Sequence, residues 1–153
     1  MTATHQFTAL VGIDGSTNSR SALDWAINYV AARGGLVKVV MSWSYAPVAA
    51  AGYGIGGALP PADSMSDATE ASLSAALEGL HVPDNVAVEG VVAEGAAARV
   101  LLHEAETSEA DIIVVGKRGH GGFVGLLIGS VATQVANHAP CPVVIVPSDD
   151  DHK

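Results

Sequence analysis

Residues 116–130, with the sequence GKRGHGGFVGLLIGS, contain six glycines in fifteen positions and directly follow the apolar run IIVV. Two residues separate Gly116 from Gly119, nine separate Gly119 from Gly129, and Ser130 follows at the expected start of a helix. Glycines let backbone N–H groups approach an anion, and a helix N-terminus adds unpaired amides and partial positive charge. The arrangement suits a phosphate group, and a flexible connection is the alternative interpretation.

The side chains around this stretch also favour an anion. Lys117, Arg118 and His120 bring positive charge into a chain whose net charge is -9. The sequence differs from two well-known phosphate motifs: G-x-x-x-x-G-K-[ST] occurs nowhere, and the first expected strand is followed by GIDGS rather than by G-x-G-x-x-G. Any anionic ligand must therefore be held by a local arrangement.

The composition restricts the class of protein. The chain has 153 residues, which fits one domain, and 49% of them are apolar against 15% charged, which excludes disorder. The net charge of -9 and a pI near 4.8 argue against nucleic acid and anionic membrane as partners. No apolar run is long enough to cross a membrane, and the opening MTATHQF lacks the features of a signal peptide, so we expect a cytoplasmic protein.

The sequence predicts neither a metal site nor a catalytic triad. The histidines other than His120 are scattered without the spacing of metal ligands, and the aspartates at 149–151 are interpreted as part of a solvated tail. No serine or cysteine is paired with a histidine and a carboxylate at a recognisable motif spacing. Cys141, the single cysteine, cannot form an internal disulfide and is expected to be a buried structural thiol.

The spacing of apolar residues predicts the elements that position the glycine stretch. Short continuous apolar runs indicate strands, and apolar residues recurring every three or four positions indicate helices. Gly34 and Gly35 supply a stop for the first helix, and Ser130 is expected to cap the last one. The predicted order is a strand at 7–13, a helix around 22–31, a strand at 36–43, a helix beginning near Ser66 or Asp67, a strand at 86–92, a helix around 97–105, a strand at 112–115, a helix from Ser130 and a strand at Val143–Val146.

Strands and helices alternate strictly, and the strands are continuously apolar. This combination predicts an open, doubly wound α/β domain, with a five-stranded parallel sheet and helices on both faces. Such sheets bind ligands at the carboxyl ends of the strands, where the strand order reverses, and both Asp14 and Gly116 fall at such ends. We expect one domain over residues 1–153, with a core at about 7–147, a mobile loop at about 44–64 and an acidic tail at 148–153.

The combination of motifs resembles the universal stress protein family. The pattern G-x2-G-x9-G-[ST] is followed by a V-x3-V helix, and VGIDGS lies near the start of the chain. The motifs VVAEG, ADIIVVGKRGHGG and PCPVVIVP agree as well, so that the likeness covers residues 11–147. It implies a Rossmann-like fold of the adenine nucleotide alpha hydrolase kind, a homodimer, and a regulatory stress-response module that binds ATP, with cyclic AMP as the alternative ligand.

The resemblance also implies roles for individual residues. Ile13 and Asp14 would lie beside the base and ribose, and the main chain near Ser42 at the adenine edge. Magnesium could accompany the ATP. Lys117 stands at a position where the family more often carries a small hydroxyl residue. The ribose and phosphates would be held by Gly116, Gly119, Gly129 and Ser130, with Val115, Val131 and Ala132 packing alongside.

Other interpretations of these residues and of the whole chain stay open. Asp14, Ser16 and Ser130 stand at helix starts, where capping explains them without a ligand. A slow ATPase is a second hypothesis, for which only Asp14 and His120 are available beside the phosphates. A phosphoryl-accepting receiver would need more acids at the strand ends, and a binding-deficient scaffold would not need bare backbone in the glycine stretch.

The last strand, Val143–Val146, is the candidate dimer interface. An unpaired apolar strand at a sheet edge invites pairing with a second copy of itself. The alternative is that this strand lies in the interior of the sheet.

Overall fold

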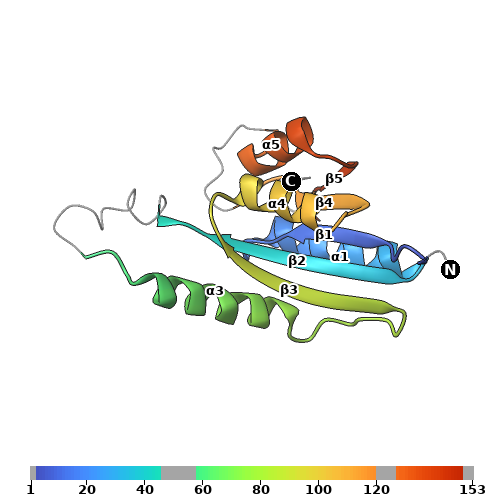
Figure 1. Ribbon diagram of the computed structural model, residues 1–153, viewed down its shortest axis with the longest axis horizontal. Helices are drawn as coiled ribbons and strands as arrows, with labels where there is room; N and C mark the ends of the chain where they lie inside the picture. The colour runs from blue at the N-terminus through green and yellow to red at the C-terminus, as the bar shows by residue number, and fades with distance from the viewer. Residues whose placement is uncertain (1–2, 46–57, 120–126, 150–153) are drawn as a thin grey trace.

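The computed structural model describes residues 3–45, 58–119 and 127–149. These residues form a five-stranded sheet with helices on both faces (Figure 1), which confirms the predicted doubly wound α/β fold. The strands are β1 (Thr8–Gly12), β2 (Gly35–Trp43), β3 (Val86–Glu94), β4 (Ile112–Gly116) and β5 (Val143–Val146), and the helices are α1 (Thr17–Ala31), α3 (Ala62–Leu77), α4 (Ala97–Thr107) and α5 (Ser130–His138).

The order of the strands creates a crevice at the centre of the sheet. The order is β3-β2-β1-β4-β5, and every neighbouring pair is parallel. The chain builds one half outward from β1 to β3, then crosses over through α4 and builds the other half from β4 to β5. Because the direction of winding reverses between β1 and β4, their carboxyl ends open into the space where such folds bind ligands.

Two hydrophobic clusters on opposite faces explain why the strands are continuously apolar. Val11 of β1 faces α1 and packs in the same cluster as Leu23, and both side chains are fully buried. Leu10, the preceding residue, points to the other face, where Leu101 of α4 and Val135 of α5 belong to its cluster. Since both faces of the sheet are covered, both sets of alternating residues in a central strand are apolar, as at residues 9–11 of β1 and 112–115 of β4.

Helix α3 begins earlier than the sequence predicted. It starts at Ala62 after Pro61, not near Ser66 or Asp67, so the loop predicted at 44–64 ends before that point. Residues 46–57 of that loop lie outside the described residues. Apolar spacing missed the first turns because Leu73 is the only buried side chain that the structure describes in this helix. Among the helices of the described ranges, none combines the length and the hydropathy that a membrane span requires.

The segment after β5 is more closely attached than a solvated tail. Ser148, the first residue of the predicted tail, is 1% exposed, and its Oγ accepts a hydrogen bond from Asn18 Nδ2 at 3.2 Å. Asp149 is exposed, and residues 150–153 lie outside the described part of the chain. The tail prediction is therefore wrong for Ser148, whose polarity concealed a buried hydrogen-bonding role.

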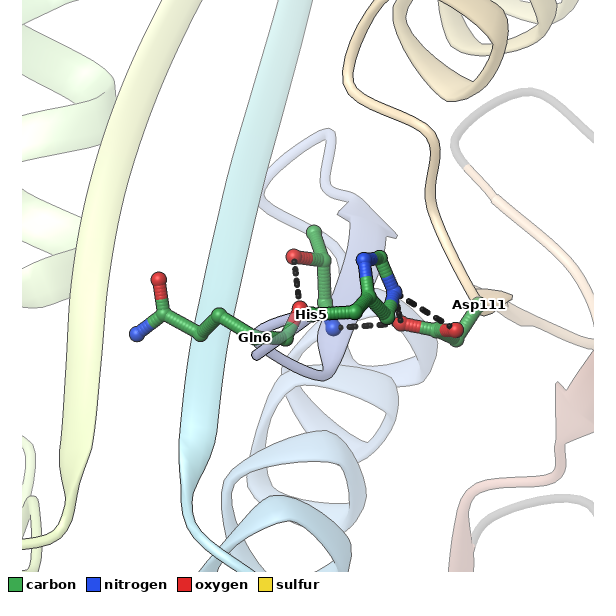
Figure 2. A network of polar contacts seen from close by, with 4 residues as sticks. His5, Gln6 and Asp111 are labelled. Carbon is green, nitrogen blue, oxygen red and sulfur yellow. Dashed lines mark hydrogen bonds and ion pairs between the residues drawn. The ribbon is translucent and has the colours of Figure 1, made fainter. Parts of the chain in front are cut away.

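A polar cluster fastens the N-terminal segment to the amino end of the sheet, opposite the crevice. The Nε2 atom of His5 lies 3.0 and 2.9 Å from the two carboxylate oxygens of Asp111, as Figure 2 shows. The N–H of Thr8 donates to the same carboxylate at 2.8 Å, and the N–H of Asp111 donates to the Thr8 carbonyl at 2.8 Å. Asp111 thereby joins the start of β4 to the residues that lead into β1. His5 is exposed, and its contact with Asp111 was not foreseen from the sequence.

Cys141 lies at the same end of the sheet, immediately before β5, and is partly buried. Burial raises the pKa of its thiol, and the carboxylate of Asp111 raises that pKa further. The thiolate is the reactive form of cysteine, so a raised pKa lowers the reactive fraction at neutral pH. The structure thus supports an unreactive thiol, although one less deeply buried than predicted.

We expect Cys141 to react with iodoacetamide more slowly at neutral pH than an ordinary exposed cysteine, with a rate that climbs only at higher pH. Replacing Asp111→Asn removes one of the two causes of the raised pKa and should move the rate-against-pH curve to lower pH. Mass spectrometry of timed alkylation measures both curves. Glu109→Gln is the matched control, and a curve for Asp111→Asn that coincides with that control would contradict the assignment.

Candidate functional site

A cavity of about 340 Å³ lies at the carboxyl ends of β1 and β4, and it falls within the usual range for small-molecule sites of roughly 300 to 1,000 Å³. Residues from far apart in the sequence meet there, and all ten residues singled out from the sequence line this one cavity. They are Ile13, Asp14, Ser42, Val115, Gly116, Gly119, Gly129, Ser130, Val131 and Ala132.

One wall of the cavity is the turn between β1 and α1. Gly15 adopts a φ of 85°, a left-handed conformation that glycine tolerates and that turns the chain into the helix. Asp14 Oδ1 accepts a hydrogen bond from the N–H of Ser16 at 2.9 Å. Ser16 caps α1, because its Oγ accepts from the N–H of Ser19 at 3.2 Å. The cap is therefore Ser16, and the Asp14 carboxylate stays at the exposed mouth of the cavity.

The opposite wall is formed by the described ends of the glycine stretch, and residues 116–119 pack tightly against the first wall. A Cβ atom at Gly116 would lie 2.8 Å from both C and Cβ of Asn18 on α1. At Gly119 a Cβ would lie 2.5 Å from Oδ2 of Asp14. Both distances are shorter than real Cβ contacts. Gly116 is thus required by the protein itself, because the atoms it meets are helix backbone, whereas Gly119 meets the end of a side chain that can move.

The start of α5 closes one end of the cavity, where the sequence predicts that a phosphate group would fit. Gly129, not Ser130, is the N-cap, so the predicted capping role of Ser130 is wrong by one position. The N–H of Gly129 donates to the carbonyl of Lys117 at 2.7 Å, which fixes this turn against the preceding strand end. A side chain at 129 would come within 3.3 Å of that carbonyl. Ser130 is the first helical residue, and its exposed side chain provides no cap.

The geometry of α5 leaves donors at this end. The first N–H groups of a helix have no intrahelical partner and carry partial positive charge. In α5 these are the amides that follow Gly129, whereas the carbonyl of Gly129 already accepts from the N–H and Oγ1 of Thr133 at 3.0 and 2.8 Å. Ser130 lines the cavity, and an anion bound there could accept from its amide and its hydroxyl.

The floor of the cavity is apolar and was not foreseen from the sequence. Val40 of β2, Ala97 and Leu101 of α4 line it. Gly12 contributes too, because a Cβ there would lie 2.7 Å from Cδ1 of Leu101. These residues read as ordinary core positions, and no sequence signal separates a core residue from one that also faces a cavity. An apolar floor with amides at one end suits a ligand that has a flat apolar ring and an anionic group.

Cationic side chains complete the lining. Lys117 and Arg118 both border the cavity, which places two of the seven lysines and arginines of an acidic chain at one site. The N–H of Arg118 donates to Oδ1 of Asn18 at 3.3 Å. His120, the third cationic candidate, lies outside the described residues.

Comparisons with a family model and with curated proteins agree on one family. The family model for the universal stress protein family matches residues 7–147. Universal stress protein Rv2623 of Mycobacterium tuberculosis is 34% identical over 140 residues, and the match covers 92% of this chain and 45% of that protein. A second M. tuberculosis relative, Universal stress protein Rv2005c, is 36% identical over 140 residues, with 89% and 44% coverage. The chain therefore spans about half the length of these curated relatives.

Solved structures agree with these matches. A universal stress protein in complex with cAMP is 26% identical, has a TM-score of 0.61, and the match covers 95% of this chain and 100% of that one. A universal stress protein family protein from Arabidopsis thaliana with AMP bound has a TM-score of 0.62, with 95% and 94% coverage. At 17% identity the second likeness concerns the fold alone.

The tight contact at Gly116 predicts a loss of stability on substitution. Gly116→Ala places a Cβ against helix backbone, which cannot move as a side chain can, and should lower the free energy of unfolding by about 1–3 kcal/mol. Gly119→Ala is the matched control, because its Cβ meets only the carboxylate of the exposed Asp14, which can rotate away. Urea unfolding measures both. Equal free energies for the two variants would show that α1 does not pack on β4 as described.

Proposed function

The chain belongs to the universal stress protein family, and from this membership and the cavity we propose that it binds an adenine nucleotide, ATP, as part of a stress-response module. The observation that carries the proposal is one cavity that joins an apolar floor to the start of α5, where the first helix amides have no intrahelical partner. A purine ring needs the first and a phosphate chain the second.

We assign the base and ribose to the side of β1 and β2. Ile13 and Asp14 would lie beside the base and ribose, and the main chain near Ser42 would meet the adenine edge. The apolar floor supports this assignment, because Val40 and Leu101 offer carbon surface on which a purine can lie. The carboxylate of Asp14 lies at the exposed mouth of the cavity, and carboxylate oxygens accept hydrogen bonds from hydroxyl groups such as those of a ribose.

The phosphates are assigned to the side of β4 and α5. Gly116, Gly119 and Gly129 would bring backbone close to the phosphate oxygens, and Ser130 would add its amide and hydroxyl. Packing alongside is assigned to Val115, Val131 and Ala132, all of which line the cavity.

Lys117 and Arg118 favour a ligand with several negative charges. Coulombic attraction grows with the charge of the ligand, so two cations at the rim stabilise a triphosphate more than a singly charged cyclic nucleotide. This charge argument places ATP ahead of cyclic AMP. Cyclic AMP stays the alternative ligand, because the 26% identical relative was solved in complex with it. Magnesium would accompany ATP through its phosphates.

Calorimetric titration of nucleotide-free protein should give saturable binding of ATP with magnesium, and Gly129→Val should reduce that affinity by at least tenfold. A valine at 129 crowds the backbone of Lys117 and Arg118, where its Cβ alone would come within 3.3 Å, and it blocks the start of α5. The φ of -69° at this position is ordinary for any residue, so the variant should fold.

Circular dichroism and urea unfolding of the same variant separate binding from folding. Ser130→Val offers a second variant, which loses a hydroxyl but keeps the amide and should weaken binding less than Gly129→Val. Retained affinity in folded Gly129→Val would remove the glycine stretch from the binding site. Tighter binding of cyclic AMP than of ATP would replace the ligand and keep the site.

We further propose that the protein acts as a homodimer through β5. Within the described residues this strand lies at the edge of the sheet, next to β4 alone. The N–H of Ile113 donates to the Pro142 carbonyl, and that of Lys117 to the Val146 carbonyl. Because alternate residues of a parallel strand bond to one neighbour, Val143 and Ile145 turn their backbone groups to the open side. Partly exposed apolar side chains on this edge favour a second copy as the occupant.

Val144→Lys should convert the dimer into a monomer, because two copies of the charge would be brought together across the edge. Analytical ultracentrifugation measures the change. Val144→Thr, which has nearly the same shape without the charge, should stay dimeric. A folded Val144→Lys variant that sediments as wild type would rule out pairing through β5.

A further inference from the structure

Asn18, in the first turn of α1, connects two segments that are far apart in the sequence. Its Oδ1 accepts a hydrogen bond from the N–H of Arg118 at 3.3 Å, within the glycine stretch. Its Nδ2 donates to Oγ of Ser148 at 3.2 Å, in the segment that follows β5. One amide side chain therefore holds a wall of the cavity and the C-terminal segment against the same helix turn.

The surroundings leave these three segments little freedom to move independently. The backbone of Asn18 lies so close to Gly116 that a Cβ there would come within 2.8 Å of it. Ser148 is 1% exposed. The N–H of Lys117, the residue before Arg118, donates to the carbonyl of Val146 at 2.9 Å. This bond is a second link between the glycine stretch and the end of β5. A shift of residues 116–119 would therefore act on Ser148 through these hydrogen bonds.

We propose that Asn18 is a positioning residue that couples the glycine stretch to docking of the segment beginning at Ser148. Docking of Ser148 orients the Asn18 amide, and the oriented amide holds the N–H of Arg118 in the position that shapes the cavity. The half of the proposal that concerns a ligand rests on the proposed nucleotide binding. By linkage, a nucleotide that favours the held arrangement of the stretch also favours the docked C-terminal segment.

The coupling gives nucleotide occupancy a route to the edge of the sheet. Ser148 lies two residues beyond Val146, the last residue of β5, with Pro147 between them. Proline fixes its own φ, so the link between Ser148 and the strand end has one fewer rotatable bond with which to absorb a displacement of Ser148. The state of the cavity is thereby sensed where a second copy of the chain would pair.

Three substitutions test the two hydrogen bonds of Asn18 separately and together. Asn18→Ala removes both. Asn18→Asp keeps an oxygen that can accept from the N–H of Arg118 but loses the donor to Ser148. Ser148→Ala removes the acceptor of the Asn18 Nδ2 bond and leaves the Asn18 side chain itself unchanged. Thr17→Ala, in the same helical turn and exposed, is the matched control.

The first measurement is amide hydrogen exchange in ligand-free protein, over residues 116–119. We expect faster exchange there in Ser148→Ala and in Asn18→Asp, although neither substitution removes the acceptor of Arg118. Asn18→Ala should exchange fastest, and Thr17→Ala as wild type. Wild-type exchange over 116–119 in both Ser148→Ala and Asn18→Asp would overturn the coupling, whether or not the protein binds nucleotide.

The second measurement is binding of adenosine and of ATP by calorimetry. Adenosine is uncharged, so the added carboxylate of Asn18→Asp affects it little, and any loss reports on the arrangement of the cavity. We expect Ser148→Ala to lower affinity on the order of fivefold, and the double variant Asn18→Ala/Ser148→Ala to be no weaker than Asn18→Ala. Additive losses would mean that the two residues act separately and would contradict the proposal. If the wild type bound neither ligand, the proposed function would be contradicted. The hydrogen-exchange result would then remain the test of the coupling.

Discussion

The close approach of α1 to the end of β4 is the contact on which the site depends. It is possible only because Gly116 has no side chain, since a Cβ there would overlap the backbone of Asn18. This approach brings the turn at Asp14 opposite the glycine stretch and creates the cavity between them. It also carries Asn18 to within hydrogen-bonding distance of Arg118 and Ser148. A single missing side chain thus determines the geometry of both walls.

The glycines of the motif therefore serve the packing of the protein first, and contact with a ligand would be a second role. Read as a sequence, Gly116 and Gly119 indicate bare backbone for a phosphate. In the structure each of them accommodates a group of the opposite wall, the helix backbone in one case and the Asp14 carboxylate in the other. The two roles agree physically, because a helix turn packed directly on the strand end also narrows the crevice in which an anion would be held.

Sequence reasoning succeeded where one property determined the outcome. Continuous apolar runs identified the strands because both faces of the sheet are covered, and helix α1 was identified by its buried stripe and its glycine stop. It failed at Ala62–Leu77 because the first turns of that helix bury little, and at Ser130 because an N-cap differs from the next residue only in backbone angles. The pairing of Asn18 with Ser148 bridges 130 positions and has no periodic signal at all.

The charge of the chain explains why the site is built mainly from backbone. A protein with a net charge of -9 repels anions at long range, and side-chain cations are few. Peptide N–H groups at the start of a helix have no charge to be neutralised by neighbouring carboxylates, and their dipoles act within the first turn. Fixing these amides requires that the preceding turn be held rigidly, as the bond from the Gly129 N–H to the Lys117 carbonyl does. The bond between Gly129 and Lys117 is thus the kind of constraint that an anion site in an acidic protein would require.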